Sequence, residues 1–279
     1  MTARPDPEAL LTLGLVTARA AAAFVRERRP DGRVDVAATK SSPTDPVTEI
    51  DRATEQLIRS TILAERPGDT ILGEEGGAIL GEERRESETA GSPVRWVVDP
   101  IDGTVNFVYG LPQYAVAIAA EVDGVVEAGC VIDVAAGHEY TAVRGGGSYW
   151  RASPSREAVR LSAVAPVSAS QALVATGFNY VPEVRARQAQ AVARLLLDVR
   201  DIRRTGSAAL DLCAVAAGRL DAYVEQGLAP WDLAAGGLIA REAGVVVTGL
   251  DGPADERLAV AAPEAFAEEF LRLVRACGF

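Results

Sequence analysis

The stretch Arg95–Thr104, with the sequence RWVVDPIDGT, joins a run of apolar residues to a turn that carries two aspartates. The apolar run predicts a buried strand over 95–98 that ends at Asp99 and Pro100. Pro100 lacks a backbone N–H and has a fixed φ, and Gly103 lets another backbone approach closely. We therefore expect a turn that aims the carboxylates of Asp99 and Asp102 at one point.

Five further carboxylates stand at the ends of other predicted elements: Asp45, Asp51, Glu74, Glu75 and Asp232. Taken singly, each has a structural explanation. Glu74 and Glu75 lie between Gly73 and Gly76 and could form a solvated turn, whereas Asp232 could cap the N-terminus of a helix. The pair Asp102-Gly103 is also common in ordinary turns. The combination of these acids is more informative than any one of them.

A metal site explains that combination. Carboxylates that converge without a basic partner repel one another, and a hard divalent cation relieves this repulsion. Ligands that are all oxygen, with no His or Cys, favour Mg²⁺ over zinc. Gly103 and Thr104, followed by a helix-like stretch, would offer backbone N–H groups to an anion such as phosphate. Carboxylates, Mg²⁺ and an anion site together indicate phosphoryl chemistry.

Composition and motifs argue against several other functions. The 279 residues include 28 Lys and Arg against 39 Asp and Glu, and a net charge of −11 disfavours a nucleic-acid binder. The single histidine, His138, nearly excludes Ser-His-Asp and Cys-His catalysis. The P-loop glycines are absent. Two acids three residues apart on one turn suit shared metals better than the opposite faces of a sugar, which disfavours a glycosidase.

The N-terminus and the cysteines bear on the cellular location. The apolar stretch Ala9–Val25 is similar to a signal peptide, but Asp6 and Glu8 stand where positive charge is expected, so an amphipathic helix is favoured. No uncharged apolar run reaches the roughly 18 residues of a membrane span. The three cysteines are widely spaced and form no C-x-x-C pair, which fits buried thiols in a reducing compartment. We expect a cytoplasmic protein without membrane contact.

Hydrophobic periodicity and turn residues predict alternating elements. In the first half we expect helices over 7–28 and 46–65, strands at 70–73, 95–98, 114–122, 125–134 and 138–144, and a solvated loop or short helix over 78–93. In the second half we expect strands at 173–175, 200–203, 220–225, 245–247 and 258–261, and helices near 182–198, 207–217, 233–243 and 263–276. Such alternation is typical of an α/β layered unit.

The Gly- and Pro-containing stretch 145–166 is the best candidate for a boundary between two halves. We therefore expect two subdomains. The first, 1–147, is an N-terminal α+β unit that carries most of the candidate metal ligands. The second, 148–279, is a C-terminal α/β unit that carries Asp232 and the substrate pocket.

Five blocks of this sequence resemble the signatures of the inositol monophosphatase family. They are 40–51, 73–75, 96–107, 206–211 and 231–236, in order and at family-like spacing. The block with Asp-Pro-Ile-Asp-Gly-Thr, Asp99–Thr104, is highly specific. The resemblance implies an α+β or α/β layered fold, namely the αβαβα sandwich of the sugar-phosphatase type with two subdomains. It also implies a homodimer and inhibition by Li⁺.

The resemblance implies two to three Mg²⁺ ions in each active site. Glu74, Asp99 and the Ile101 carbonyl resemble the ligands of the first ion. Asp99, Asp102 and Asp232 resemble those of the second, and Glu74 with water those of a third. Glu74 and Thr104 then position the water that attacks phosphorus, while Asp51 resembles the residue that tunes the Thr104 hydroxyl.

Substrate contacts are implied in the same way. The backbone amides of Gly103 and Thr104 resemble those that hold phosphate. Residues that resemble contacts to substrate hydroxyls are Gly206, Ser207, Ala208, Glu225 and Asp232. Lys40 and Glu75 resemble family residues that lie behind the metal ligands or in a loop. Asn179, Tyr180 and Arg185 are weaker candidates for the leaving-group pocket. The segment 150–160 lacks the Asn-Gly hairpin of many members, which leaves its conformation open.

The resulting expectation is a Mg²⁺-dependent phosphatase that acts on a small phosphomonoester, myo-inositol 1-phosphate. Histidinol phosphate, fructose 1,6-bisphosphate and 3′-phosphoadenosine 5′-phosphate are alternative substrates on the same metal site. A non-catalytic interaction protein on the same fold is the alternative from another class. The loss of a metal-binding acid would favour that alternative, but Glu74, Asp99, Asp102 and Asp232 are all present.

Overall fold

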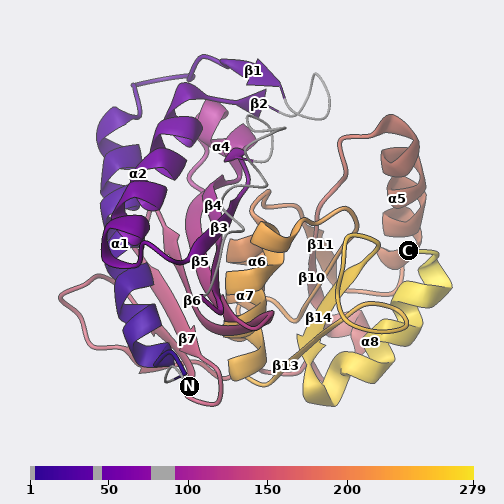
Figure 1. Cartoon of the computed structure of the whole chain (residues 1–279). Helices are drawn as coiled ribbons and strands as arrows, with labels where there is room; N and C mark the ends of the chain where they lie inside the picture. Colours follow the sequence, from indigo (N-terminus) through magenta and orange to yellow (C-terminus); the bar gives the residue numbers. More distant parts are fainter. Residues whose placement is uncertain (1–3, 40–45, 77–91) are drawn as a thin grey trace.

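The computed structural model describes residues 4–39, 46–76 and 92–279. Its helices and two main sheets form five layers, in the order helices, sheet, helices, sheet, helices (Figure 1). The αβαβα sandwich that the resemblance implies is thereby confirmed. The expected loop over 78–93 lies almost entirely outside the described residues.

The first helical layer consists of α1 (Pro7–Arg28) and α2 (Glu49–Glu65). The two helices pack on one face of the larger sheet, where Leu10, Val25 and Ile58 join Trp96 and Ile118 in one apolar core. By length and composition alone α1 could cross a membrane. The packing of its small apolar residues on the sheet explains this composition, which supports the amphipathic-helix interpretation.

The larger sheet has seven strands in the order β3-β4-β5-β6-β7-β8-β9. Strands β3 and β4 are parallel and all other neighbours are antiparallel. The strands are β3 (Thr70–Gly73), β4 (Val94–Asp102), β5 (Ala115–Val122), β6 (Val125–Asp133), β7 (Glu139–Val143), β8 (Gly147–Arg151) and β9 (Val159–Arg160). The predicted strands of the first half are confirmed within one or two residues, except β4.

The middle layer consists of α6 (Ala208–Ala216) and α7 (Pro230–Glu242), which have apolar residues on two sides. Leu238 and Ile239 pack toward the larger sheet, whereas Leu212 and Ala240 pack toward the smaller one. Both helices are therefore covered on two faces. Their N-terminal ends reach the residues that follow β4, as described below.

The smaller sheet has five strands in the order β11-β10-β12-β14-β13. The strands are β10 (Leu173–Thr176), β11 (Asp201–Arg203), β12 (Ala222–Glu225), β13 (Val245–Thr248) and β14 (Ala259–Pro263). On its outer face lie α5 (Pro182–Leu195) and α8 (Glu264–Cys277), with Phe266 and Phe270 in the core. Each of these elements was predicted.

Helix α5 ends at Leu195 and not at residue 198, and helix α7 begins at Pro230 and not at residue 233. Two further predicted boundaries, in α2 and β4, are also wrong. Helix α2 begins at Glu49 and not at residue 46, because Pro46–Val47 form β2 and pair with β1 (Ala38–Thr39). Thr48 caps α2 in a capping box with Asp51. Strand β4 continues to Asp102, beyond the predicted end at Asp99, because pairing with β5 resumes after a register shift between Asp99 and Asp102.

The segment 148–160 belongs to the larger sheet, since β8 and β9 extend it at one edge. Strand pairing in the first sheet therefore continues past residue 147 and ends at Arg160, inside the stretch where a boundary was expected. The division into subdomains 1–147 and 148–279 stays a prediction. Cys130, Cys213 and Cys277 are buried free thiols, as expected.

Candidate active site

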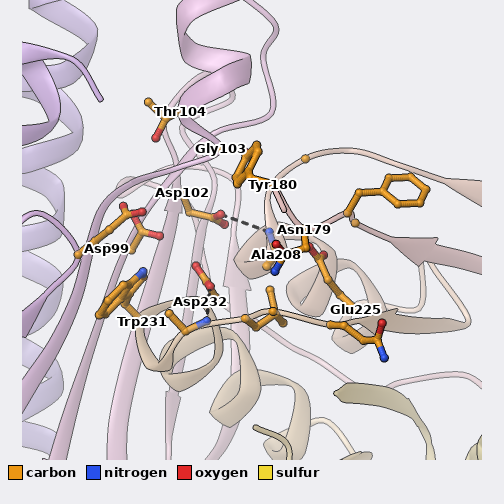
Figure 2. Close-up of a pocket in the computed structure, with 18 of the residues that line it drawn as sticks. Asp99, Asp102, Gly103, Thr104, Asn179, Tyr180, Ala208, Glu225, Trp231 and Asp232 are labelled. Atoms are coloured by element: carbon orange, nitrogen blue, oxygen red, sulfur yellow. Dashed lines mark hydrogen bonds between the residues drawn. The ribbon is translucent and has the colours of Figure 1, made fainter. Parts of the chain in front are cut away.

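A cavity of about 460 Å³ lies where the end of β4 meets loops of the second half of the chain. Asp99, Asp102 and Thr104 line it from β4 and from the start of α4 (Thr104–Tyr109). The facing wall comes from the segments 177–181 and 225–232. Figure 2 shows Asp99, Asp102 and Asp232 pointing toward one another in this cavity.

Three carboxylates form the centre of the site. One oxygen each from Asp99, Asp102 and Asp232 lies within 4.8 Å of the other two. All these donors are oxygen atoms on rigid elements, which is the donor chemistry that Mg²⁺ prefers. The residues present therefore fit a hard divalent cation, and the cluster could hold one.

Asp102 is held by the N-terminus of α6. The Ser207 hydroxyl donates to Asp102 Oδ2, and so does the amide of Ala209 at 2.8 Å, while the amide of Ala208 donates to Oδ1 at 3.3 Å. Burial raises the pKa of Asp102, and these hydrogen bonds oppose that rise. A helix N-terminus stabilises negative charge, so α6 orients this carboxylate and offsets part of the cost of its burial.

Asp232 occupies the first turn of α7, and its Oδ2 accepts a hydrogen bond of 2.7 Å from the Ala229 amide. The structural explanation, a capping role, is therefore confirmed, and this role is compatible with metal binding. Burial is the largest cause that raises the pKa of Asp232 well above its ordinary value, followed by the negative charges of Asp102 and Glu74. A cation bound between these carboxylates would offset the repulsion between their negative charges.

Glu74 reaches the same cavity from β3. The Glu74 amide donates to the Val98 carbonyl at 3.2 Å, so the parallel pairing of β3 and β4 continues and Glu74 lies beside Asp99. Residues paired across parallel strands point to the same face of the sheet. This explains how two blocks that are distant in sequence supply one cluster.

Thr104 connects this cluster to α2. Its hydroxyl lies 3.2 Å from Asp51 Oδ1 and 3.1 Å from the Ile101 carbonyl, and Asp51 is fully buried. The structure thus brings together the predicted pair of Asp51 and Thr104. Gly103 has φ +94°, and a Cβ there would lie 2.7 Å from the Gln113 carbonyl oxygen, so a glycine is required at this turn.

Glu225 lies at the end of β12 and lines the cavity together with Gly206 and Ala208. The Tyr223 hydroxyl donates to Glu225 Oε2 at 2.7 Å. Burial raises the pKa of Glu225 to about 7, and the hydrogen bond from Tyr223 opposes that rise. The hydrogen bond from Tyr223 thus fixes the position of Glu225 Oε2.

Comparison with known proteins identifies the family. The model of the inositol monophosphatase family matches residues 6–278. The chain belongs to the inositol monophosphatase family.

Three relatives illustrate the membership. The inositol-1-monophosphatase SuhB of Mycobacterium tuberculosis is 48% identical over 92% of this chain and 95% of its own length. The Vibrio cholerae protein called Nus factor SuhB is 41% identical over 78% of this chain and 76% of its own. The solved structure of Mycobacterium tuberculosis SuhB has a TM-score of 0.81 at 44% identity and covers 98% of both chains. Membership of this family and the name inositol-1-monophosphatase support a phosphatase, whereas the name Nus factor does not.

Some expected site residues of this family member lie away from the cavity. Ser207 is 1% exposed, and its hydroxyl is engaged by Asp102, so it lies behind a metal-binding candidate and not on the cavity wall. Glu75 is 2% exposed, and its amide donates to Glu55. Arg185 donates to the Asn179 carbonyl and does not line the cavity. Lys40 and Asp45 lie outside the described residues.

Other residues of the site escaped the sequence interpretation. Arg204 lines the cavity, and its charge opposes the rise that burial causes in the pKa values of Asp102 and Glu225. Asn106 donates to the carbonyls of Gln113 and Thr205 at 2.7 and 2.8 Å and so ties α4 to the loop before α6. Asn106 lies inside the block 96–107, and Arg204 lies just before the block 206–211. Their position in or beside these blocks was the signal in the sequence that could have identified them. The expected Asn179 and Tyr180 do line the cavity.

Proposed function

We propose that this chain is a Mg²⁺-dependent phosphomonoesterase that hydrolyses myo-inositol 1-phosphate to myo-inositol and phosphate. The observation that carries the proposal is the convergence of Asp99, Asp102 and Asp232 in a cavity that Glu225 also lines. Membership of the inositol monophosphatase family supports the same chemistry. The names of the mycobacterial relatives favour inositol phosphate among the alternatives.

The proposed ligands are those implied by the resemblance: Glu74, Asp99 and the Ile101 carbonyl for one ion, Asp99, Asp102 and Asp232 for a second, and Glu74 for a third. When bound by these residues, Mg²⁺ would supply charge neutralisation for the phosphate and would lower the pKa of the attacking water. The carboxylates hold the ions, and α6 keeps Asp102 from turning away. Three acids with this spacing support the assignment.

Thr104 and Glu74 orient the water in this proposal. The Thr104 hydroxyl donates to Asp51 or to the Ile101 carbonyl, which leaves its oxygen lone pairs available to accept a hydrogen bond from the water. The amides of Gly103 and Thr104 hold the phosphate, so that water attacks in line with the ester oxygen. Because the groups are held before substrate arrives, little reorganisation is needed in the transition state.

The leaving group lies against Glu225, Gly206 and Ala208. A carboxylate whose one oxygen is occupied by Tyr223 offers the other to a substrate hydroxyl. A polyol such as inositol supplies hydroxyl donors at this point, which is why we favour it over a leaving group without hydroxyls. Asn179 and Tyr180 lie on the same wall and add contacts to that leaving group.

The decisive experiment is phosphate release from myo-inositol 1-phosphate with and without millimolar Mg²⁺, beside histidinol phosphate, fructose 1,6-bisphosphate and 3′-phosphoadenosine 5′-phosphate. We expect fast release that depends on Mg²⁺ and favours the inositol ester. Preference for another ester would keep the mechanism and overturn the substrate. Failure of every ester would overturn the catalytic proposal.

A binding role is the second candidate, because relatives such as the Vibrio cholerae protein bear the name Nus factor. The four acidic candidates Glu74, Asp99, Asp102 and Asp232 are all retained here, which favours catalysis. The two roles are separable by Asp99→Asn, which removes turnover but should leave a binding surface elsewhere intact.

The proposal also includes the expectations on assembly and location. We propose a homodimer in the cytoplasm, inhibited by Li⁺, with two to three Mg²⁺ ions in each site and no nucleic-acid or membrane partner. Sedimentation velocity tests the dimer. A Li⁺ titration of turnover and calorimetric Mg²⁺ titration test the remaining points on ions.

A further inference from the structure

The turn that carries Glu74 is held by an ion pair on α2 in which the glutamate is buried and the arginine is partly exposed. The Glu55 carboxylate accepts the Glu75 amide at 2.7 Å on Oε2 and the Gly76 amide at 2.9 Å on Oε1. The Arg59 guanidinium donates to Oε1 from one helical turn further along, at 2.8 Å. Glu55 is 3% exposed, so its charge has been removed from water for these three contacts.

The glycines of this turn are explained by the same contact. A Cβ on Gly73 would lie 2.5 Å from the Glu55 carboxyl, and a Cβ on Gly76 would lie 2.4 Å from the Arg59 guanidinium. Side-chain atoms do not approach so closely without a shift. The pattern Gly73-Glu74-Glu75-Gly76 therefore provides space for Glu55 and Arg59 on both sides of the two acids.

The other side of the turn is fixed by the sheet. The Glu74 amide donates to Val98, and Gly73 is paired with the same residue. The backbone is therefore held by β4 at Glu74 and by the Glu55 carboxylate at the next two residues, Glu75 and Gly76. Between these contacts Glu74 lines the cavity together with Asp99.

We propose that Glu55, oriented by Arg59, is a positioning residue that fixes Glu74 for metal binding. The inference rests on the proposed function, because it takes Glu74 as a Mg²⁺ ligand. Glu55 itself touches neither the cavity nor the substrate. A carboxylate is needed because one backbone N–H group donates to each of its two oxygens. In a glutamine side chain an NH₂ group would replace one of these oxygens and face a backbone N–H donor.

The test compares Glu55→Gln with Thr54→Val. Thr54 is a buried neighbour on the same helix, and its hydroxyl bonds the Ile50 carbonyl of its own helix and not the turn. For both variants we would measure Mg²⁺ binding to the substrate-free protein by isothermal titration calorimetry, the melting temperature in EDTA, and kcat against Mg²⁺ concentration.

We expect Glu55→Gln to weaken Mg²⁺ binding by about 10-fold, the lower end for loss of a group that orients a metal ligand. The Mg²⁺ concentration that gives half-maximal kcat should rise by the same factor. Thr54→Val should leave both quantities unchanged, even where its melting temperature falls as far as that of Glu55→Gln. Equal Mg²⁺ affinity in Glu55→Gln and the parent protein would overturn the proposal.

Two further variants keep the test decisive if Glu55→Gln does not fold. Arg59→Met leaves the Glu55 carboxylate but removes its support, and Gly73→Ala pushes that carboxylate away without changing it. Both should weaken Mg²⁺ binding in the calorimeter, and unchanged affinity in both would also overturn the proposal. Calorimetry measures Mg²⁺ binding and does not require turnover. If the parent protein released no phosphate, the proposed function would be overturned, but the role of Glu55 would still be tested by the Mg²⁺ affinities.

Discussion

At the scale of single residues, the same side chains stabilise the fold and face the candidate active site. Asp102 accepts three hydrogen bonds at the start of α6, and Asp232 bonds the amide before α7, yet both acids also face the cavity. A carboxylate has about four lone-pair positions on its two oxygens, so the three hydrogen bonds to Asp102 and the single one to Asp232 still leave a position for a ligand. Structural and functional explanations of such acids therefore do not compete.

Asp99→Asn tests the metal assignment. We expect phosphate release to fall by at least about 100-fold, because a metal ligand loses its charge. Folding should be retained, since the amide oxygen can still accept from the Ile101 amide and one charge leaves a repulsive cluster. Phosphate release at saturating Mg²⁺ and melting in EDTA measure the two effects. Turnover close to that of an exposed control, Asp198→Asn, would refute the assignment.

Tyr223→Phe tests how Glu225 selects substrates. Loss of the hydroxyl removes the hydrogen bond to Glu225 Oε2. We expect KM for myo-inositol 1-phosphate to rise about 5-fold, the equivalent of one hydrogen bond, with little change in kcat. KM for p-nitrophenyl phosphate, which offers no such hydroxyl, should stay constant.

The matched control is Tyr140→Phe, a buried tyrosine whose hydroxyl bonds Arg219 and which does not line the cavity. It should leave both KM values unchanged. An equal rise for the two esters in Tyr223→Phe would show a general disturbance of the site and contradict selection through Glu225.

At the scale of elements, the site depends on where strands and helices begin and end. Strand β4 delivers Asp99 and Asp102, the start of α7 delivers Asp232, and the start of α6 supports Asp102. Thr48 at the N-cap of α2 sets the position of Asp51, whose carboxylate faces Thr104. The ends of elements carry backbone groups without partners inside the element, so polar side chains gather there.

Thr48→Ala tests this cap. We expect the free energy of unfolding to fall by about 1 kcal/mol, the usual cost of losing a side-chain N-cap. Urea denaturation in EDTA measures the change. Thr61→Ala on the same helix is the control, because its hydroxyl only bonds the Leu57 carbonyl and alanine favours a helix. A loss no greater than in this control would contradict the capping role.

At the scale of the whole molecule, stacking five layers places the site at the seam between the two halves. The cavity takes walls from the ends of both sheets and from the helices between them. Burying acidic side chains where the two halves meet lowers the free energy of unfolding. Burial raises the pKa of Asp211, behind the cavity, to about 8, although a hydrogen bond from Thr205 opposes the rise.

This burial predicts a pH dependence of stability. Because the folded-state pKa of Asp211 lies above its unfolded value, its contribution is fully present below about pH 4 and is lost as pH rises through about 8. In EDTA the protein should therefore lose stability between about pH 4 and 8. Asp211→Asn should lessen this loss by at most about 1.4 kcal/mol per pH unit.

Urea denaturation across this pH range measures the effect. Asp201→Asn is the control, since Asp201 is exposed and its pKa is lowered by Arg203. A pH profile of Asp211→Asn that matches those of the parent and this control would show that Asp211 does not titrate as expected.

The helices, strands and acidic candidates were accessible from the sequence because their signals are local. Hydrophobic period, glycine turns and the block from Asp99 to Thr104 need no knowledge of distant residues. Even the wrong start of α2 had a local cause, since the cap at Thr48 was overlooked. The sequence by itself thus determined most of the elements, the family resemblance and the candidate acids, whereas the short strands β1, β2, β8 and β9 were not predicted.

Only the tertiary structure decided which partner each acid has. The hydroxyl of Ser207 turns to Asp102, 105 residues away, and not to the cavity. Glu55 meets the amides of a turn 20 residues further along the chain, and Thr104 meets Asp51 across 53 residues. Such contacts depend on the packing of layers formed far apart in sequence, and no local pattern encodes the direction in which a buried side chain finally points.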